Sequence, residues 1–414
     1  MQANALHDVK FQLMCQNVLV AQRADVAGGW EVIRHDLLPH NIDFFTQQPR
    51  MLAEAGVAVD ASGVSGAAGL HADGGPAGED LSLESYRTEQ FLRFLANRVL
   101  PLNRAHAEKL LDYLDLPLGQ SIMERARIAL MFRAVSVCDS WWVKFGETDL
   151  TRWENVRLLD NELNPSFSML SLFGDLRRSH FANIWRGDER IAEVLLKGTS
   201  AKGLFRNEKS GQLFLYKADT RGGESRKEAS ATKILSKLNV YAHLPYEFVK
   251  MWNSETGEMV NCSKCKVMSS NMRAIVHASE CDVYMNRHGV DAVTYARFCY
   301  LREFAQMVVV DYLLSNADRH HENWGYFRDM LNGKILGLLP LYDHNRAFDK
   351  DLQGNGDMPS PLLKNRSMRE AAKQFAEYAG LKAWESIDES DFPDPLAHEV
   401  FVERCEELRI PWKM

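Results

Sequence analysis

The segment from Asp311 to Phe348 constrains the fold of this 414-residue chain more than any other stretch. It begins within a run of helical period, Tyr295 to Leu314, whose wide apolar stripe predicts a mostly buried helix. Asn332-Gly333 then predicts a hairpin turn between a strand over Trp324–Phe327 and a returning apolar strand over Ile335–Leu341. The sequence therefore predicts a helix, a polar loop and a hairpin in succession.

Three acidic or amide side chains occupy this segment: Asp318, Asn323 in the polar loop, and Asp343 just past the returning strand. Phosphoryl transfer needs such a set, because one carboxylate accepts the proton of the attacking hydroxyl while an amide oxygen and a second carboxylate hold magnesium. The step D-x-x-x-x-N occurs in kinase catalytic loops, with a metal-binding Asp on a later hairpin. If only Asp318 and Asn323 are considered, an ordinary polar surface loop is the alternative interpretation. The surrounding helix, the hairpin and the third side chain, Asp343, count against this alternative.

Two runs carry a resemblance to the HipA-like Ser/Thr kinases of bacteria: NADRHHENWG at 316–325 and LYDHN at 341–345. The form D-R-H-x-x-N is also similar to phosphoinositide 3- and 4-kinases. The resemblance implies that Asp318 is the catalytic base and that Asn323 and Asp343 are magnesium ligands. The sequence departs from the Asp-Phe-Gly of ordinary protein kinases, because His344 and Asn345 follow Asp343. We expect Arg319 and His320 to brace the loop rather than to take part in the chemistry.

A second candidate segment lies upstream, at 197–217. Its first part, KGTSAKG at 197–203, is a small flexible loop of the kind that brings backbone N–H groups close to phosphates. This predicts nucleotide contacts at Gly198, Thr199 and Ser200, although the loop matches neither G-x-x-x-x-G-K-[ST] nor G-x-G-x-x-G. By resemblance, Thr199 and Ser200 lie where HipA-like kinases can autophosphorylate. Two strands joined by a tight turn are predicted to follow, over 204–206 and 212–217.

Lys217 shares one face of the second predicted strand with Leu213 and Leu215, which is unusual unless the lysine has an anionic partner. Glu228 lies on a predicted helix over 225–238. A strand–helix Lys–Glu pair is how kinases position the α- and β-phosphates of ATP, so both residues are candidate nucleotide-binding residues. Each residue taken alone also fits an ordinary surface role, as a lysine reaching solvent or a glutamate on a solvated helix face.

Two further strands are predicted over 246–249 and 260–268, where they would form the hinge side of a kinase cleft. Residues 273–286 are predicted to be a helical or irregular insertion. Cys262, Cys265, His277 and Cys281 have a zinc-like appearance, but the first pair lies in a predicted strand and the spacing is irregular. Structural zinc is therefore the less favoured interpretation.

Composition narrows the class of protein. Hydrophobic residues make up 46% of the chain and charged residues 25%, which permits a large core. A net charge of −7 argues against direct nucleic-acid binding over the whole chain. No apolar run reaches ~18 residues, so we expect no membrane span. The N-terminus lacks a signal-peptide pattern, and seven cysteines without a regular framework favour reduced thiols and a cytoplasmic location.

We predict an α+β, two-lobed protein-kinase-like fold with a mostly helical N-terminal extension. Within this extension Asn103 is a candidate helix cap for 104–114, and Trp141 and Trp142 are expected to pack as an aromatic core between helices. The predicted parts are a small β-rich segment at 1–52, a flexible Ala- and Gly-rich linker at 53–80, a helical module at 81–189, a small lobe at 190–265 and a large lobe at 266–414.

The resemblance implies transfer of the ATP γ-phosphoryl group to a Ser or Thr of a protein substrate, with Mg²⁺ bound and Lys217 orienting the phosphates. It also implies a toxin-like or regulatory role with an antitoxin-like or DNA-binding partner protein. Two alternatives stay open. A lipid or small-molecule kinase fits the D-R-H-x-x-N form, but no basic membrane-facing cluster is evident. A pseudokinase that uses the cleft only to bind nucleotide is the other, and the presence of all the polar groups needed for catalysis counts against it.

Overall fold

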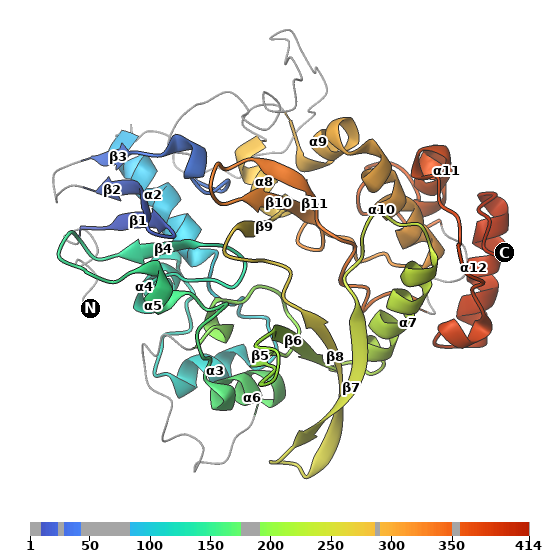
Figure 1. Cartoon of the computed structure of the whole chain (residues 1–414), viewed down its shortest axis with the longest axis horizontal. Helices are drawn as coiled ribbons and strands as arrows, with labels where there is room; N and C mark the ends of the chain where they lie inside the picture. Colours follow the sequence, from blue (N-terminus) through green and yellow to red (C-terminus); the bar gives the residue numbers. More distant parts are fainter. Residues whose placement is uncertain are drawn as a thin grey trace, which may run out of the picture.

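The structure is a computed structural model that describes residues 10–23, 29–42, 83–174, 191–285, 290–349 and 357–413. The predicted linker at 53–80 lies outside these ranges. Within them, helices surround three antiparallel sheets (Figure 1). This mixture of helices and sheets agrees with the predicted α+β class.

The first sheet combines N-terminal strands with one strand from further along the chain. In spatial order they are β3 (Trp30–Val32), β2 (Val18–Arg23), β1 (Gln12–Cys15) and β4 (Trp141–Lys144). Short strands near the N-terminus are thus confirmed, and the largely helical segment that follows also contains one strand, β4, whose aromatic and β-branched side chains favour that conformation. Trp141 and Trp142 are buried, and their indole N–H groups donate to the carbonyls of Leu37 and Gln16 at 2.8 and 2.7 Å.

Helices supply much of the rest of this half. They are α2 (Leu83–Ala96), α3 (Ala107–Tyr113), α4 (Ile122–Met131), α5 (Trp153–Val156) and α6 (Pro165–Phe173), with short 3-10 turns η2 (His35–Leu37) and η4 (Glu193–Leu195). Asn103 does not cap α3, which begins later, after His106 with φ 66°. Ser121 caps α4 in a reciprocal capping box with Glu124.

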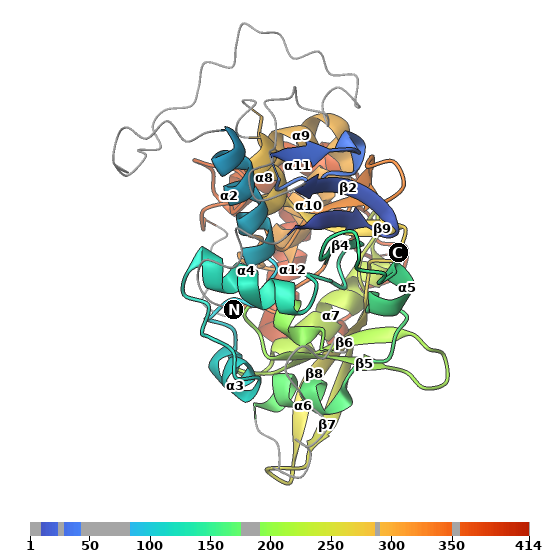
Figure 2. The ribbon, with the colours of Figure 1, turned by 90° about the vertical axis from the view of Figure 1, so that its left-hand side faces the viewer.

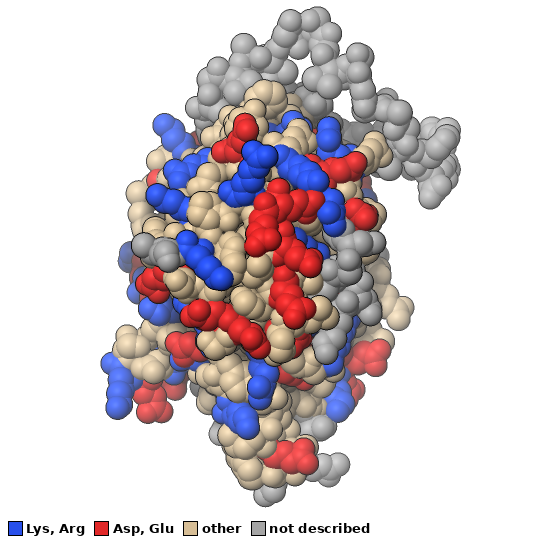
Figure 3. All heavy atoms as spheres, turned by 90° about the vertical axis from the view of Figure 1, so that its right-hand side faces the viewer, with Lys and Arg blue, Asp and Glu red and all other residues tan. Residues whose placement is uncertain are grey.

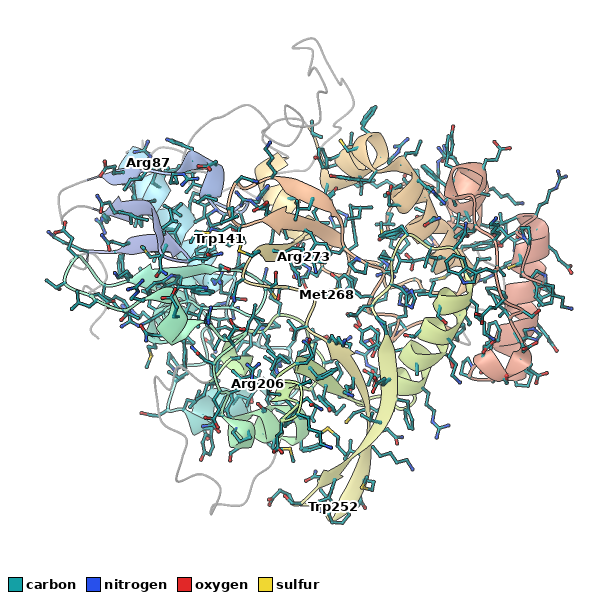
Figure 4. All side chains as sticks on the ribbon, in the orientation of Figure 1. Arg87, Trp141, Arg206, Trp252, Met268 and Arg273 are labelled. Carbon is teal, nitrogen blue, oxygen red and sulfur yellow. The ribbon has the colours of Figure 1, made fainter. Side chains whose placement is uncertain are left out.

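The second sheet has the strand order β5 (Lys202–Arg206), β6 (Leu213–Ala218), β8 (Glu258–Lys266) and β7 (Tyr246–Asn253). These strands lie where the sequence predicts strands. Helix α7 (Glu224–Lys237) packs against β7 and β8, and α6 packs against β5. The β7–β8 hairpin projects from the molecule, with Trp252 near its tip (Figure 4).

The third sheet has the order β11 (Ile335–Leu338), β10 (Gly325–Asp329) and β9 (Arg273–His277), with α8 (Ala278–Met285) after β9. The predicted hairpin is confirmed, but the predicted insertion over 273–286 is wrong in its first part, because β9 pairs with β10 along its whole length. Strands β9 and β10 approach each other closely at Gly325, where a Cβ atom would lie 2.2 Å from the carbonyl oxygen of Val276. Arg328 on β10 joins this sheet to the N-terminal region by donating to the carbonyls of Asp36 and Leu38, each at 2.7 Å.

The C-terminal helices are α9 (Ala292–Cys299), α10 (Leu301–Leu313), α11 (Met368–Ala379) and α12 (Pro395–Glu407), with η7 (Glu389–Asp391). The buried helix predicted over 295–314 is therefore two helices that meet at Tyr300, whose φ of −138° and ψ of 46° are not helical. A large hydrophobic cluster surrounds α10, and a second one joins the first sheet, α2 and α4 to the edge of the second sheet. In the side view the first sheet and α2 lie above the second sheet (Figure 2).

The face formed by the C-terminal helices carries both signs of charge. Acidic side chains gather in a central band there, with Lys and Arg around them (Figure 3). This face therefore lacks the continuous basic surface that is typical of nucleic-acid binding. Among the described residues, no helix has the length and apolar character needed to cross a membrane.

Candidate active site

One cleft, between the second and third sheets, brings together almost all of the predicted site residues. Its lining includes Gly198, Thr199, Ser200, Lys217, Asp318, Asn323 and Asp343. Met268 also lines it, and lies between the two sheets (Figure 4). Glu228 does not line the cleft itself, but it forms an ion pair with Lys217, which does. Side chains more than a hundred positions apart in sequence therefore meet at one place.

Lys217 on β6 holds two carboxylates at once. Its Nζ lies 2.8 Å from Oε1 of Glu228 and 2.7 Å from Oδ1 of Asp343. The Glu228 side chain is only 1% exposed, which rules out the solvated helix face, and its second oxygen accepts from the hydroxyl of Ser263. Burial opposes the charge on Lys217, but Asp343 and Glu228 outweigh it and raise the pKa of Lys217 well above its usual value. The lysine is therefore a fixed cation at the cleft.

The Asp318 loop, residues 315–324, is braced from within by Arg319. This arginine is fully buried, and its guanidinium pairs with Asp311 on α10 at 2.9 Å. It also donates to the carbonyls of Asn323 and Tyr342, at 2.7 and 2.6 Å, so one side chain ties the loop to the residue before Asp343. The prediction that Arg319 has a bracing role is confirmed.

Within the Asp318 loop the two predicted site residues take different roles. The Asn323 amide Nδ2 donates to the backbone carbonyl of Asp318 at 2.8 Å, which leaves its Oδ1 as the acceptor end. The carboxylate of Asp318 is half-buried and lines the cleft. His320 is exposed, and its ring Nδ1 accepts from the backbone N–H of Glu322 at 3.2 Å.

Asp343 is held in an uncommon conformation. Its φ of 59° lies in the left-handed region, which non-glycine residues adopt at some energetic cost and which is frequent at functional sites. Burial alone would raise its pKa, but attraction and hydrogen bonding by Lys217 lower the pKa below its usual value, so the side chain is a carboxylate at neutral pH. His344, which replaces the Phe of ordinary kinases, is buried at 3.1 Å from Arg319, and burial lowers its pKa. It is therefore neutral.

Sequence reasoning missed Lys202, a buried lysine that lines the cleft beside Lys217. It is paired directly with Lys217 across β5 and β6, and its Nζ donates to the carbonyl of Lys197 at 2.6 Å, beneath Gly198. Burial, helped by the charges of Arg104 and Lys217, lowers the pKa of Lys202 to about 7. Two lysines directly opposite each other repel, so this arrangement favours an anion in the cleft.

We expect Lys202→Met to raise the melting temperature (Tm) of the protein and to weaken the binding of an anionic ligand in the cleft. Between pH 7 and the usual lysine pKa, the unfolded chain binds a proton that the folded chain does not, so stability rises with pH across this window. Below pH 7 the folded protein carries the full free-energy cost of burying the protonated lysine, and the substitution to Met removes this cost. Scanning calorimetry should show a rise of about 2–4 °C at pH 6 and a smaller one at pH 9.5. A lower Tm at pH 6 would contradict this account.

The zinc alternative fails on the geometry of β8. Cys262 and Cys265 are three positions apart on one strand, so their side chains point to opposite faces. They belong to different hydrophobic clusters, Cys262 with Ala218 and Cys265 with Tyr246. Within the described part of the chain, no three His, Cys, Asp or Glu side chains are grouped so that they could hold a metal.

The sequence matches no protein-family model and no curated protein. Among solved structures, it is similar to HipA in a complex of the Shewanella oneidensis MR-1 toxin–antitoxin system with HipB and operator DNA, at 12% identity and a TM-score of 0.46 over 96% of this chain and 97% of that chain. It is also similar to the Helicobacter pylori proinflammatory kinase CtkA, at 14% identity and a TM-score of 0.34 over 50% of this chain and 88% of that one.

Proposed function

We propose that this chain is an ATP- and Mg²⁺-dependent kinase that transfers the γ-phosphoryl group to a Ser or Thr hydroxyl of a protein. The observation that carries the proposal is the meeting, in one cleft, of the Lys217–Glu228 pair with Asp343, Asp318 and Asn323. A fixed cation, an ionised carboxylate, an amide and a second carboxylate are the groups that phosphoryl transfer uses. The loop at Gly198–Ser200 lines the same cleft as Lys202 and Lys217, and its backbone N–H groups would contact the phosphates.

The donor set fits a magnesium ion. Asp343 is ionised, and Asn323 offers an amide oxygen on the facing loop. Mg²⁺ prefers oxygen ligands and is usually held through one or two carboxylates together with substrate phosphates, so a complete cage of protein ligands is not needed. When bound, the ion would neutralise the negative charge of the phosphates.

The side chains of the cleft divide the work of the reaction. Lys217 and Lys202 hold the phosphates, while Asp318 takes the proton of the acceptor hydroxyl. A bond forms between that hydroxyl oxygen and the γ-phosphorus, the bond from the γ-phosphorus to the bridging oxygen breaks, and ADP leaves with the electron pair. The Nζ of Lys217 lies 2.7 Å from Oδ1 of Asp343, so phosphate oxygens that reach Lys217 would compete with this carboxylate.

We expect Asp343→Ala to weaken binding of Mg·ATP by at least about tenfold, because the ionised metal ligand is lost. Binding of ATP without magnesium should be unchanged or tighter, since Lys217 loses a competing carboxylate and the phosphates lose a like charge. Fluorescence titrations with and without Mg²⁺ separate the two effects. Equal affinity of variant and wild type for Mg·ATP would show that Asp343 is not a metal ligand.

The proposal is tested by incubating the purified protein with γ-labelled ATP and Mg²⁺ and mapping the label by mass spectrometry. Label on Ser or Thr, at Thr199 or Ser200 or on an added protein, supports a Ser/Thr kinase. Label confined to lipid or small-molecule acceptors would replace the protein substrate. ATP binding without any transfer would favour the pseudokinase alternative.

The resemblance at 316–325 and 341–345 supports a second part of the proposal, a toxin-like or regulatory kinase that works with an antitoxin-like or DNA-binding partner protein. Such a partner would itself contact DNA, which is consistent with the net charge of −7 on this chain.

A further inference from the structure

Asn345 lines the cleft, and the reaction described above gives it no role. It stands two positions after Asp343, where the Asp-Phe-Gly of ordinary kinases has a glycine and therefore no side chain. Asp343 and Asn345 both line the cleft, whereas His344 between them is buried beside the guanidinium of Arg319, at 3.1 Å. The departure from the ordinary kinase sequence therefore adds an amide to the wall of the cleft.

The amide of Asn345 is not held by the protein. Its Oδ1 is buried and has no hydrogen-bond partner, and no residue that the structure describes bonds to this side chain in any other way. A buried polar atom without a partner costs about 1–3 kcal/mol, so such atoms are uncommon unless a ligand satisfies them. Because no bond fixes the amide, it can turn about its terminal bond and direct its oxygen into the cleft without losing a hydrogen bond.

Two other acceptor oxygens of the cleft share this property. Lys217 donates to Oδ1 of Asp343, and Oδ2 of Asp343 receives no hydrogen bond from the residues that the structure describes. Asn323 donates its Nδ2 to the carbonyl of Asp318, and its Oδ1 likewise has no donor within the described ranges. One carboxylate oxygen and two amide oxygens without donors therefore belong to side chains that line the same cleft.

A divalent cation is the ligand that fits these three oxygens. Phosphate oxygens that carry no proton only accept hydrogen bonds, so they cannot satisfy an amide oxygen, whereas a cation binds both. Mg²⁺ takes its ligands from carboxylates, carbonyl oxygens and substrate phosphates. A carboxylate and an amide at alternate positions of one loop are also neighbouring ligands in calcium-binding loops. Asp343 and Asn345 have this spacing.

We propose that Asn345 is a third protein ligand of the divalent cation, through its amide oxygen, beside Asp343 and Asn323. This inference rests on the proposed function, which supplies the nucleotide and the cation. The added ligand is neutral, so the three side chains together carry a single negative charge. A divalent ion held by them keeps a positive charge for the phosphates of the nucleotide.

The test measures how strongly Mn²⁺ tightens the binding of AMP-PNP, a non-hydrolysable ATP analogue, to the full-length protein. Mn²⁺ suits the same oxygen ligands as Mg²⁺. Calorimetric titrations in EDTA and in Mn²⁺ give two values of Kd, and their ratio is the gain from the cation. We expect Asn345→Ala to lower this ratio about tenfold and to leave Kd in EDTA unchanged. Water-proton relaxation should show an additional water molecule on the bound Mn²⁺, in place of the amide oxygen.

The matched control is Asn103→Ala, at an exposed position that does not line the cleft, and it should change neither value of Kd. A second variant, Asn345→Asp, replaces the amide oxygen with a carboxylate oxygen. The ratio should then be kept or should rise, while binding in EDTA weakens, because the new charge repels the phosphates. An unchanged ratio in Asn345→Ala overturns the inference, and so does a ratio that falls as far in Asn345→Asp as in Asn345→Ala.

The inference and the proposed function fail in different ways. If the ratio depends on Asn345 but labelled ATP gives no phosphoryl transfer, the kinase function is wrong and the cation ligand stands. Phosphoryl transfer by the wild type, together with an unchanged ratio in Asn345→Ala, gives the opposite result. A wild type whose binding of AMP-PNP is not tightened by Mn²⁺ has no cation site for Asn345 to complete, which also overturns the inference.

Discussion

Asp318→Asn should reduce phosphoryl transfer by about 10²–10⁴-fold, the usual contribution of a general base, while ATP binding persists. The amide has the shape of the carboxylate but cannot take the proton of the acceptor hydroxyl. Loop geometry should survive, because Asn323 binds the backbone carbonyl of Asp318 and not its side chain. Initial rates of label transfer at saturating ATP, beside ATP affinities from titration, measure the two effects separately.

The matched control for this substitution is Asp112→Asn, which makes the same chemical change at an exposed position on α3. It should leave both rate and affinity unchanged. Near wild-type transfer by Asp318→Asn would remove Asp318 from the role of base and direct attention to His320 and Glu322, the other titratable side chains of this loop that line the cleft. A loss of ATP binding equal to the loss of rate would instead assign Asp318 to nucleotide binding.

Local signals predicted the parts of the site that adjoin one another in sequence. Asn332-Gly333 fixed the hairpin between β10 and β11, and the face shared by Leu213, Leu215 and Lys217 indicated an anionic partner for the lysine. The partner is Glu228, one helix later. Such features depend on turn chemistry and on a period of two, which neighbouring residues set.

These local signals could not predict which strands pair when the strands are far apart in the sequence. β4 joins β1 across more than a hundred residues, and β9 is a strand because β10 lies beside it. Lys202 shows the same limit within the site. In KGTSAKG it looks like a solvated loop lysine, and its burial follows from packing beside Arg104 and Lys217, which no local pattern reports.

Arg319→Met should be the most destabilising single substitution at the site. It would leave the carboxylate of Asp311 buried without its counter-charge, and breaking a buried ion pair from one side costs about 3–5 kcal/mol. The carbonyls of Asn323 and Tyr342 would also lose a donor. Urea unfolding measures the loss. Arg346→Met is the matched control, because its pair with Asp349 is 37% exposed on the arginine side and should be worth less than about 1 kcal/mol.

The double variant Arg319→Met with Asp311→Leu separates two causes of instability: the unpaired carboxylate of Asp311, and the loss of the hydrogen bonds that Arg319 donates to backbone carbonyls. Removing the carboxylate as well should recover part of the lost stability, because no unpaired charge remains buried. Catalysis should not recover with it. One guanidinium binds the carbonyls of Asn323 and Tyr342, so it sets the distance between the Asp318 loop and Asp343. We therefore expect the stabilised double variant to bind Mg·ATP weakly and transfer phosphate slowly at temperatures where it is folded. Full activity in that variant would show that packing alone, without Arg319, aligns the two loops.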